Sequence, residues 1–315
     1  MNVPDRRMIM SDKQLKQDVS DKAPERTMLM AQLLFREKPE EIPVSELQKV
    51  VEEIFGEIDL VYDAPKVPFF ALKNYRATFQ KEEGKEYNHS IDNGDGTISL
   101  PVLANFIIGE EFKTELDPLT KSQFWDFKGN FDEFKYHTSV FGMLSGSMYY
   151  KQEAELFLKE IEAALRCFPT AEAIYVPHSG KLTTVDYFRE GMGLDVSSRF
   201  IRTAVNARFF RIEDSEDFVV DTLGFFAFGG ADVQVHFHGM KPDDVVNYVY
   251  NIASYQFDAD FPIKSGDTID GLDENGKISQ EIQWKTQYED SLIQPVRAVL
   301  DINCGEYAAG NRNNT

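Results

Sequence analysis

The chain has 315 residues, of which 53 are acidic and 33 basic, so its formal net charge is −20. This surplus repels phosphate groups and no basic stripe interrupts it, so nucleic-acid binding and attachment to a membrane through a polybasic patch are both excluded. Hydrophobic residues make up 42% and aromatic residues 13%, which is enough to fill a sizeable core and excludes a largely disordered chain.

The two ends of the sequence predict little regular structure. Residues 1–26 are charged and lack the apolar stretch of a secretory signal, so we expect a mobile charged leader. No run approaches the ~18 consecutive apolar residues of a membrane span, which favours a cytoplasmic protein. The last residues, 306–315, are expected to form a flexible tail.

A first α+β lobe is predicted over residues 27–115. The apolar run at 28–35 suits a buried strand, and a helix with Ser45 as its N-cap and Gly56 at its end follows. Three further strands are predicted, at 58–63, 68–80 and 98–108. The turn sequence at 92–96 separates the last two of these strands.

A polar and aromatic connecting segment, residues 116–135, leads to a second α+β lobe at 136–305. A strand at 136–146 is expected to end at Ser147, the predicted N-cap of a long helix at 149–168. The remaining predicted strands are 171–180, 207–214, 218–238, 278–287 and the alternating stretch at 296–302, with a short helix near 183–192 and a longer one from Pro242.

Strands outnumber helices in both lobes, and few β-α-β crossovers are evident. The sequence therefore predicts an α+β fold: two similar-sized lobes of antiparallel or mixed sheet, each with helices packed on one face.

The candidate site lies in the alternating segment from Asp232 to His238. Side chains of a strand alternate, so Asp232, Gln234, His236 and His238 are expected to share one face. Two histidines at i and i+2 can reach one metal ion, and Asp232 can assist. A third ligand has to come from elsewhere, with His178 and Asp267 as candidates. The alternative, which we favour, is a half-exposed strand whose polar face meets solvent or a loop.

Other motifs favour structural interpretations. The segment at 265–271, which contains Asp267, is typical of a turn stabilised by its own side chains. Asn275-Gly276 lacks the flanking ligands of a calcium loop and predicts a hairpin turn. Cys167 and Cys304 are too few and too far apart for a disulfide scaffold or a cysteine-rich zinc site, and both are expected to be core residues. No cofactor-binding motif is evident.

Several stretches together resemble one protein family. Thr222-Leu223-Gly224, Gly230-Ala231-Asp232 and the motif at 266–269 are the most specific, and the likeness spans most of 27–305. The chain resembles the bacterial family catalogued as domain of unknown function 4261. The resemblance implies a bacterial cytoplasmic protein and no particular activity. The family has an acidic residue where Gln234 stands, which weakens a catalytic or metal-binding role for this strand.

Three functions follow as hypotheses. We favour a non-enzymatic binding module with an acidic surface, such as an immunity-like protein that binds a basic partner protein. The alternatives are a metal-assisted enzyme built on Asp232, His236 and His238, and a small-ligand binder. The oligomeric state cannot be predicted from the sequence.

Overall fold

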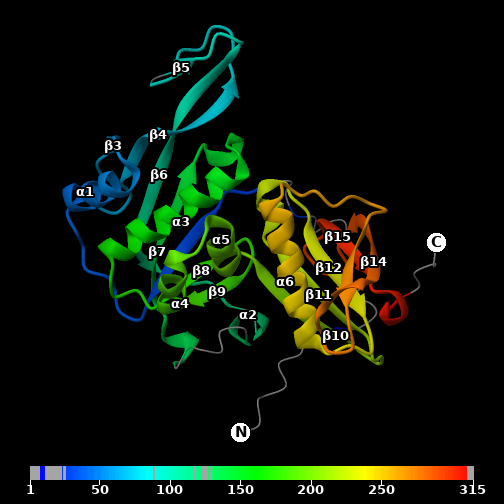
Figure 1. Cartoon of the computed structure of the whole chain (residues 1–315). Helices are drawn as coiled ribbons and strands as arrows, with labels where there is room; N and C mark the ends of the chain where they lie inside the picture. The colour runs from blue at the N-terminus through cyan, green and yellow to red at the C-terminus, as the bar shows by residue number, and fades with distance from the viewer. Residues whose placement is uncertain are drawn as a thin grey trace. The chain divides into compact units, whose positions relative to one another are not determined.

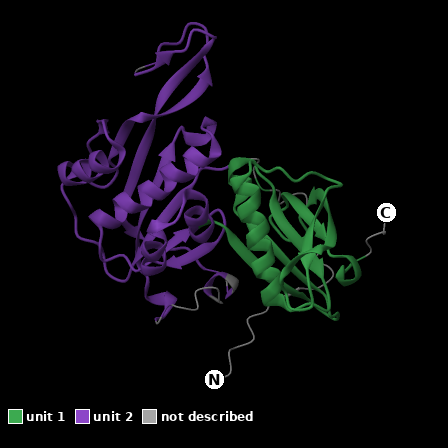
Figure 2. Cartoon of the chain, in the orientation of Figure 1, with its two compact units in different colours: residues 1–26, 204–315 green, residues 27–203 purple. Residues whose placement is uncertain are grey.

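The computed structural model describes residues 8–10, 23, 26–87, 89–116, 118–122, 127 and 129–310. The chain forms two compact units (Figure 2). The first in sequence is the central unit, residues 27–203. The other, which we call the terminal unit, combines residues 1–26 with residues 204–315.

The central unit is built on an antiparallel eight-stranded sheet with the order β3-β4-β6-β7-β2-β8-β9, and β5 pairs with β6 (Figure 1). Its strands are β2 (Met30–Phe35), β3 (Ile58–Tyr62), β4 (Phe69–Gln80), β5 (Ile91–Asp92), β6 (Thr97–Glu111), β7 (Tyr136–Met143), β8 (Ala173–Val176) and β9 (Lys181–Thr184). Strand β2 joins the early and late strands, because it pairs with both β7 and β8.

Two amphipathic helices pack together on this sheet, namely α1 (Val44–Phe55) and α3 (Tyr150–Cys167). In α1 the buried residues Leu47, Val51 and Phe55 recur every four positions, as an apolar helix stripe requires. The unit also contains α2 (Pro118–Ser122), α4 (Val185–Glu190), α5 (Val196–Ala204) and the short 3-10 turns η2 (Phe131–Glu133), η3 (Ser145–Ser147) and η4 (Gly191–Gly193).

Neither predicted serine cap is used. Pro43 occupies the N-cap of α1 in an extended conformation, and its carbonyl oxygen accepts from the amide of Leu47 (3.3 Å), so Ser45 lies inside the helix. Ser147 lies in η3, and Tyr149 is the N-cap of α3 without a side-chain hydrogen bond. The predicted end of the first helix is confirmed, because Gly56 takes a φ of 79°, a region that favours glycine.

The terminal unit contains a mixed seven-stranded sheet with the order β1-β10-β11-β12-β15-β14-β13. Its strands are β1 (Met8–Met10), β10 (Asn206–Ile212), β11 (Phe218–Leu223), β12 (Asp232–Phe237), β13 (Thr268–Leu272), β14 (Ile278–Asp290) and β15 (Ala298–Asn303). Helix α6 (Pro242–Asp258) packs on β10, β11 and β12, and η5 (Phe225–Phe228) and η6 (Gly305–Tyr307) are single turns. The predicted α+β class with antiparallel or mixed sheets is confirmed.

The structure divides the chain at a different place from the predicted lobes 27–115 and 136–305. Strand β7, after the expected connecting segment 116–135, pairs with β6 and β2 of the same sheet, with Met30 opposite Phe141. The backbone hydrogen bonds of one continuous sheet therefore hold 27–203 together. The unit boundary falls between Thr203 and Ala204 instead.

The two ends are also more ordered than predicted where the structure describes them. In the expected leader 1–26, β1 pairs in parallel with β10, and the buried Ala23 donates its amide to the Val296 carbonyl. In the expected tail 306–315, the amide of the buried Ala309 donates to the His236 carbonyl. Within the described residues, every helix is too short or too polar to serve as a transmembrane span.

Candidate functional site

Strand β12, which carries the predicted ligand face, lies in the middle of the terminal-unit sheet. It pairs antiparallel with β11 and parallel with β15, and all six of its residues are buried. The expectation of a half-exposed strand is therefore wrong. A central strand is covered on both faces, so its polar side chains must find partners inside the protein.

Asp232 has both carboxylate oxygens occupied. Oδ1 accepts from the Thr222 hydroxyl at 3.0 Å and from the Phe225 amide at 3.1 Å. Oδ2 accepts from Nε of Arg297 at 3.0 Å. The side chain has no exposed surface, so these partners replace the water that a carboxylate otherwise needs.

Arg297 links Asp232 to a second buried ion pair. Its Nη2 contacts Oδ2 of Asp221 at 2.6 Å, and Asp221 also receives two parallel bonds from Arg208, at 2.9 and 2.5 Å. We call Arg208, Asp221, Asp232 and Arg297 the buried ion-pair network. It contains two positive and two negative charges, so it is neutral as a whole, and its bidentate arginine–carboxylate geometry is of the strong kind.

The arginines of the network also hold the loop between β14 and β15. Arg297 donates to the carbonyl oxygens of Ile293 (3.2 Å) and Pro295 (3.0 Å) and to that of Thr222. Arg208 donates to the Gln294 carbonyl at 2.8 Å. The network therefore joins three consecutive strands, β10, β11 and β12, to a loop that lies much later in the sequence.

Burial and the neighbouring charges shift the pKa values of Asp232 and Arg297. It raises the pKa of Asp232, against the opposing effect of the Arg297 charge. Burial alone lowers the pKa of Arg297, but the two carboxylates more than offset this and its pKa lies above the ordinary value. The arginine therefore keeps its charge at every physiological pH.

Gln234 lies in the same polar row, and its side chain is also engaged in hydrogen bonds within the protein. Its Nε2 donates to Asp301 at 3.0 Å and to Glu289 at 3.3 Å, and its Oε1 accepts from the Leu292 amide at 2.8 Å. The amide thus bridges two carboxylates and the loop. An acidic residue here would place a third carboxylate beside them, which explains physically why glutamine suits this position.

The other predicted ligands are not brought together with Asp232 as a site. His236 is buried, and its backbone binds Ala309, whereas the half-buried His238 donates its backbone amide to the Tyr307 carbonyl at 2.8 Å. Asp267 is exposed and caps a turn, accepting from the Lys264 amide at 2.8 Å. His178 belongs to the central unit, where burial lowers its pKa to about 4 and keeps its imidazole neutral.

Metal addition gives a direct check on this strand. Among the described residues, no three His, Cys, Asp or Glu side chains lie close enough together to hold a metal ion. We expect the melting temperature of tag-free protein to stay constant when zinc or manganese is added, because only a ligand that prefers the folded state raises it. A rise that disappears in a His236→Ala variant would contradict this interpretation.

The sequence interpretation missed Arg208, Asp221 and Arg297. A signal was present for two of them, because Asp221 and Arg297 stand in mainly apolar stretches, whereas the strand of Arg208 also contains Arg211. Charges are rarely buried unless they are paired, so a charge at a core position predicts an opposite charge nearby. What the sequence does not supply is which residue is the partner.

Comparison with known proteins supports the resemblance over one part of the predicted span 27–305. Residues 221–303 match the model of a family described as "Domain of unknown function (DUF4261)". This stretch holds three of the four network residues, namely Asp221, Asp232 and Arg297. No curated protein and no solved structure matches the chain.

Proposed function

We propose that this chain is a non-enzymatic binding module that recognises a basic partner protein through exposed carboxylates of its terminal unit. The distribution of charged residues between the core and the surface supports this proposal. The polar row of β12 is built into the core as ion pairs and hydrogen bonds, while the acidic surplus lies on the surface.

The acidic turn between β10 and β11, residues 213–217, carries the proposal. It reads Glu-Asp-Ser-Glu-Asp, and Glu213, Asp214 and Glu216 are exposed while Asp217 is half-buried. Within the described residues, none of these four carboxylates forms an ion pair. Four like charges in five residues repel one another, and a cationic partner relieves that repulsion.

The terminal unit as a whole carries charge of the same sign. Residues 1–26 and 204–315 together contain 14 basic and 24 acidic residues, so 14 − 24 = −10. The buried network takes up two of these basic and two of these acidic residues, so the same acidic surplus remains on the other residues. The field around this unit is therefore negative, which accelerates the encounter with a positive protein and slows it as salt is added.

An immunity-like role, in which the module neutralises a basic toxic protein, is one form of this proposal. A metal-assisted enzyme on Asp232, His236 and His238 is the less favoured alternative. Its aspartate would have to leave Arg297, Thr222 and the Phe225 amide before it could bind a substrate or a metal ion.

The test neutralises the acidic turn without changing its shape. The variant combines E213Q, D214N, E216Q and D217N, and asparagine tolerates the positive φ of 60° at position 214. A partner captured from the source cell at low salt is identified and purified, and its association rate is measured at two ionic strengths. We expect association at least about tenfold slower for the variant at low salt, and a weaker salt dependence.

The matched control removes four exposed carboxylates of the central unit instead, Glu40, Glu41, Glu83 and Glu86, by substitution with glutamine. It changes the net charge by the same amount and is expected to retain most of the wild-type rate. The proposal fails if no basic protein is retained at low salt, or if both variants slow association equally.

A further inference from the structure

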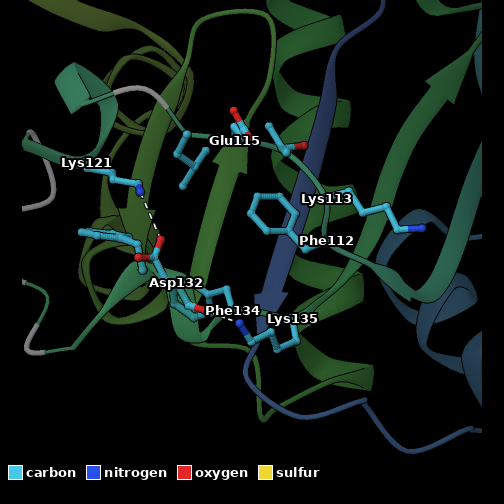
Figure 3. Close-up of a pocket in the computed structure, with 10 residues that line it drawn as sticks. Phe112, Lys113, Glu115, Lys121, Asp132, Phe134 and Lys135 are labelled. Carbon is cyan, nitrogen blue, oxygen red and sulfur yellow. Dashed lines mark hydrogen bonds and ion pairs between the residues drawn. The ribbon is translucent and has the colours of Figure 1, made fainter.

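A cavity of about 470 Å³ opens on the central unit between the end of β6 and the start of β7 (Figure 3). Phe112, Phe131 and Phe134 supply its apolar part, and Glu115, Lys121 and Lys135 supply charge. The size is that of a site for a small organic molecule. This region was predicted as a mere connection, and none of the site residues predicted from the sequence lies in it.

The aromatic side chains that line the cavity pack against the core of the central unit. Phe134 is 4% exposed and belongs to a core cluster with Leu116 and Tyr175, against which Phe112 and Phe131 pack. The Phe112 ring also meets Tyr175 edge-on, at 6.3 Å between centroids. Rings fixed in this way present a flat apolar surface without an ordering cost when a planar ligand binds.

The polar wall has a surplus of positive charge. Lys121 pairs with Asp132 at 3.1 Å, and Lys135 donates its ammonium hydrogen to the backbone carbonyl of the same Asp132. Figure 3 shows both lysines converging on Asp132, with Glu115 on the other side of the cavity. Three lysines, Lys113, Lys121 and Lys135, and two carboxylates, Glu115 and Asp132, line the cavity. Lys113 pairs with Glu111 outside it, and within the described residues no carboxylate pairs with Lys135.

Lys135 is also placed rigidly at its backbone. Its amide donates to the Phe35 carbonyl at 2.9 Å, and its own carbonyl accepts from the Phe112 amide at 2.8 Å. The residue that carries the charge is thus hydrogen-bonded directly to a residue that carries an aromatic ring. The backbones of the two residues therefore stand in a fixed relation, which keeps the ammonium group within reach of the ring.

We propose that this cavity binds a small planar anion, an aromatic ring bearing a carboxylate, sulfonate or phosphate group. The ring lies against the phenylalanines, and the anionic group binds Lys135. This site is separate from the proposed protein-binding surface, and either can fail without the other.

The test uses 1-anilinonaphthalene-8-sulfonate as the probe, titrated against the full chain and followed by fluorescence. We expect saturable binding at one site, and a Lys135→Glu variant that binds at least about tenfold more weakly, because an attraction becomes a repulsion. Benzoate should displace the probe, whereas inorganic phosphate and benzyl alcohol, which each lack half of the recognised structure, should not.

A Lys49→Glu variant is the matched control, because Lys49 is an exposed lysine of α1 and gives the same change in net charge. It should bind the probe as the wild type does, with all proteins melting at similar temperatures so that unfolded chain does not account for the signal. Equal affinity of the Lys135→Glu and wild-type proteins, or equal weakening by both variants, would overturn the proposal.

Discussion

Replacing Arg297 with methionine is expected to destabilise the protein by about 3–5 kcal/mol, the cost of removing one partner from a buried ion pair. Methionine fills much of the same space but offers no charge. Among the described residues, Asp232 then loses its one cationic partner, and Asp221 keeps only Arg208. The carbonyl groups of Ile293 and Pro295 each lose one of their donors as well, and keep the hydroxyl of Ser291.

Urea unfolding at pH 7 measures this loss directly. Arg211→Met is the matched control, because Arg211 lies on β10 three residues beyond Arg208, is partly exposed and forms no ion pair within the described residues. It should change the free energy of unfolding by less than about 0.5 kcal/mol. A comparably small loss in Arg297→Met would show that the network contributes little to stability.

Replacing Glu160 with glutamine is expected to stabilise the protein at high pH. Glu160 lies on α3 and is 2% exposed, and its Oε1 is buried without a hydrogen-bond partner within the described residues. Burial raises its pKa well above the ordinary value, and the charge of Glu153 on the same helix adds to the rise. The folded protein therefore favours the uncharged, protonated form of this side chain.

The direction of the pH dependence follows from this raised pKa. At acidic pH, Glu160 is protonated in both the folded and the unfolded chain and costs nothing. As the pH rises above the unfolded value, the unfolded chain releases the proton while the folded chain keeps it, so stability falls until the folded pKa is passed. Glutamine carries no proton to lose and avoids this decline.

Unfolding free energies of wild type and Glu160→Gln at pH 4 and pH 8 provide the measurement. Because burial raises the pKa of Glu160 well above its ordinary value, we expect the variant to be more stable by at least about 1 kcal/mol at pH 8 and to differ little at pH 4. Glu155→Gln, in which a partly exposed carboxylate of the same helix loses its pair with Lys159, should shift stability by less than about 0.5 kcal/mol at either pH. A pH-independent difference would contradict the account of Glu160.

Local patterns predicted most individual elements of this fold. The strands at 28–35 and 68–80, the long helix at 149–168 and the hairpin turn at Asn275-Gly276 all occur close to their expected positions. Each of these elements is determined by residues that lie close together in the sequence. The unit boundary depends instead on β2 pairing with β7, more than a hundred residues later, and no local pattern indicates that register.

Strand β13 and helix α5 are among the elements that were not predicted, although a local signal accompanied each of them. The stretch at 265–271 predicts a turn, and Asp267 does cap one, but Thr268–Leu272 goes on as β13 and pairs with β14. Helix α5 was not predicted, although Asp195 accepts from the Ser198 amide at 2.9 Å in the manner of an N-cap.

The alternation along β12 was predicted, but what its polar row meets was not. The alternation predicts that Asp232 and Gln234 share one face of the strand. It does not predict whether water or protein covers that face. Arg297 lies 65 residues from Asp232 in the sequence, and only the parallel pairing of β12 with β15 brings that part of the chain alongside. A long-range ion pair is therefore decided by topology, not by local pattern.

A double-mutant cycle between Asp232 and Arg297 tests most directly whether this aspartate serves the core. The free energies of unfolding of D232N, R297M and the double variant are compared with that of the wild type. We expect the double variant to be less destabilised than the sum of the single changes by about 1–3 kcal/mol, because each single change strands the other charge. Additivity within about 0.5 kcal/mol would mean that the two residues act independently, and would contradict the assignment of Asp232 to a structural ion pair.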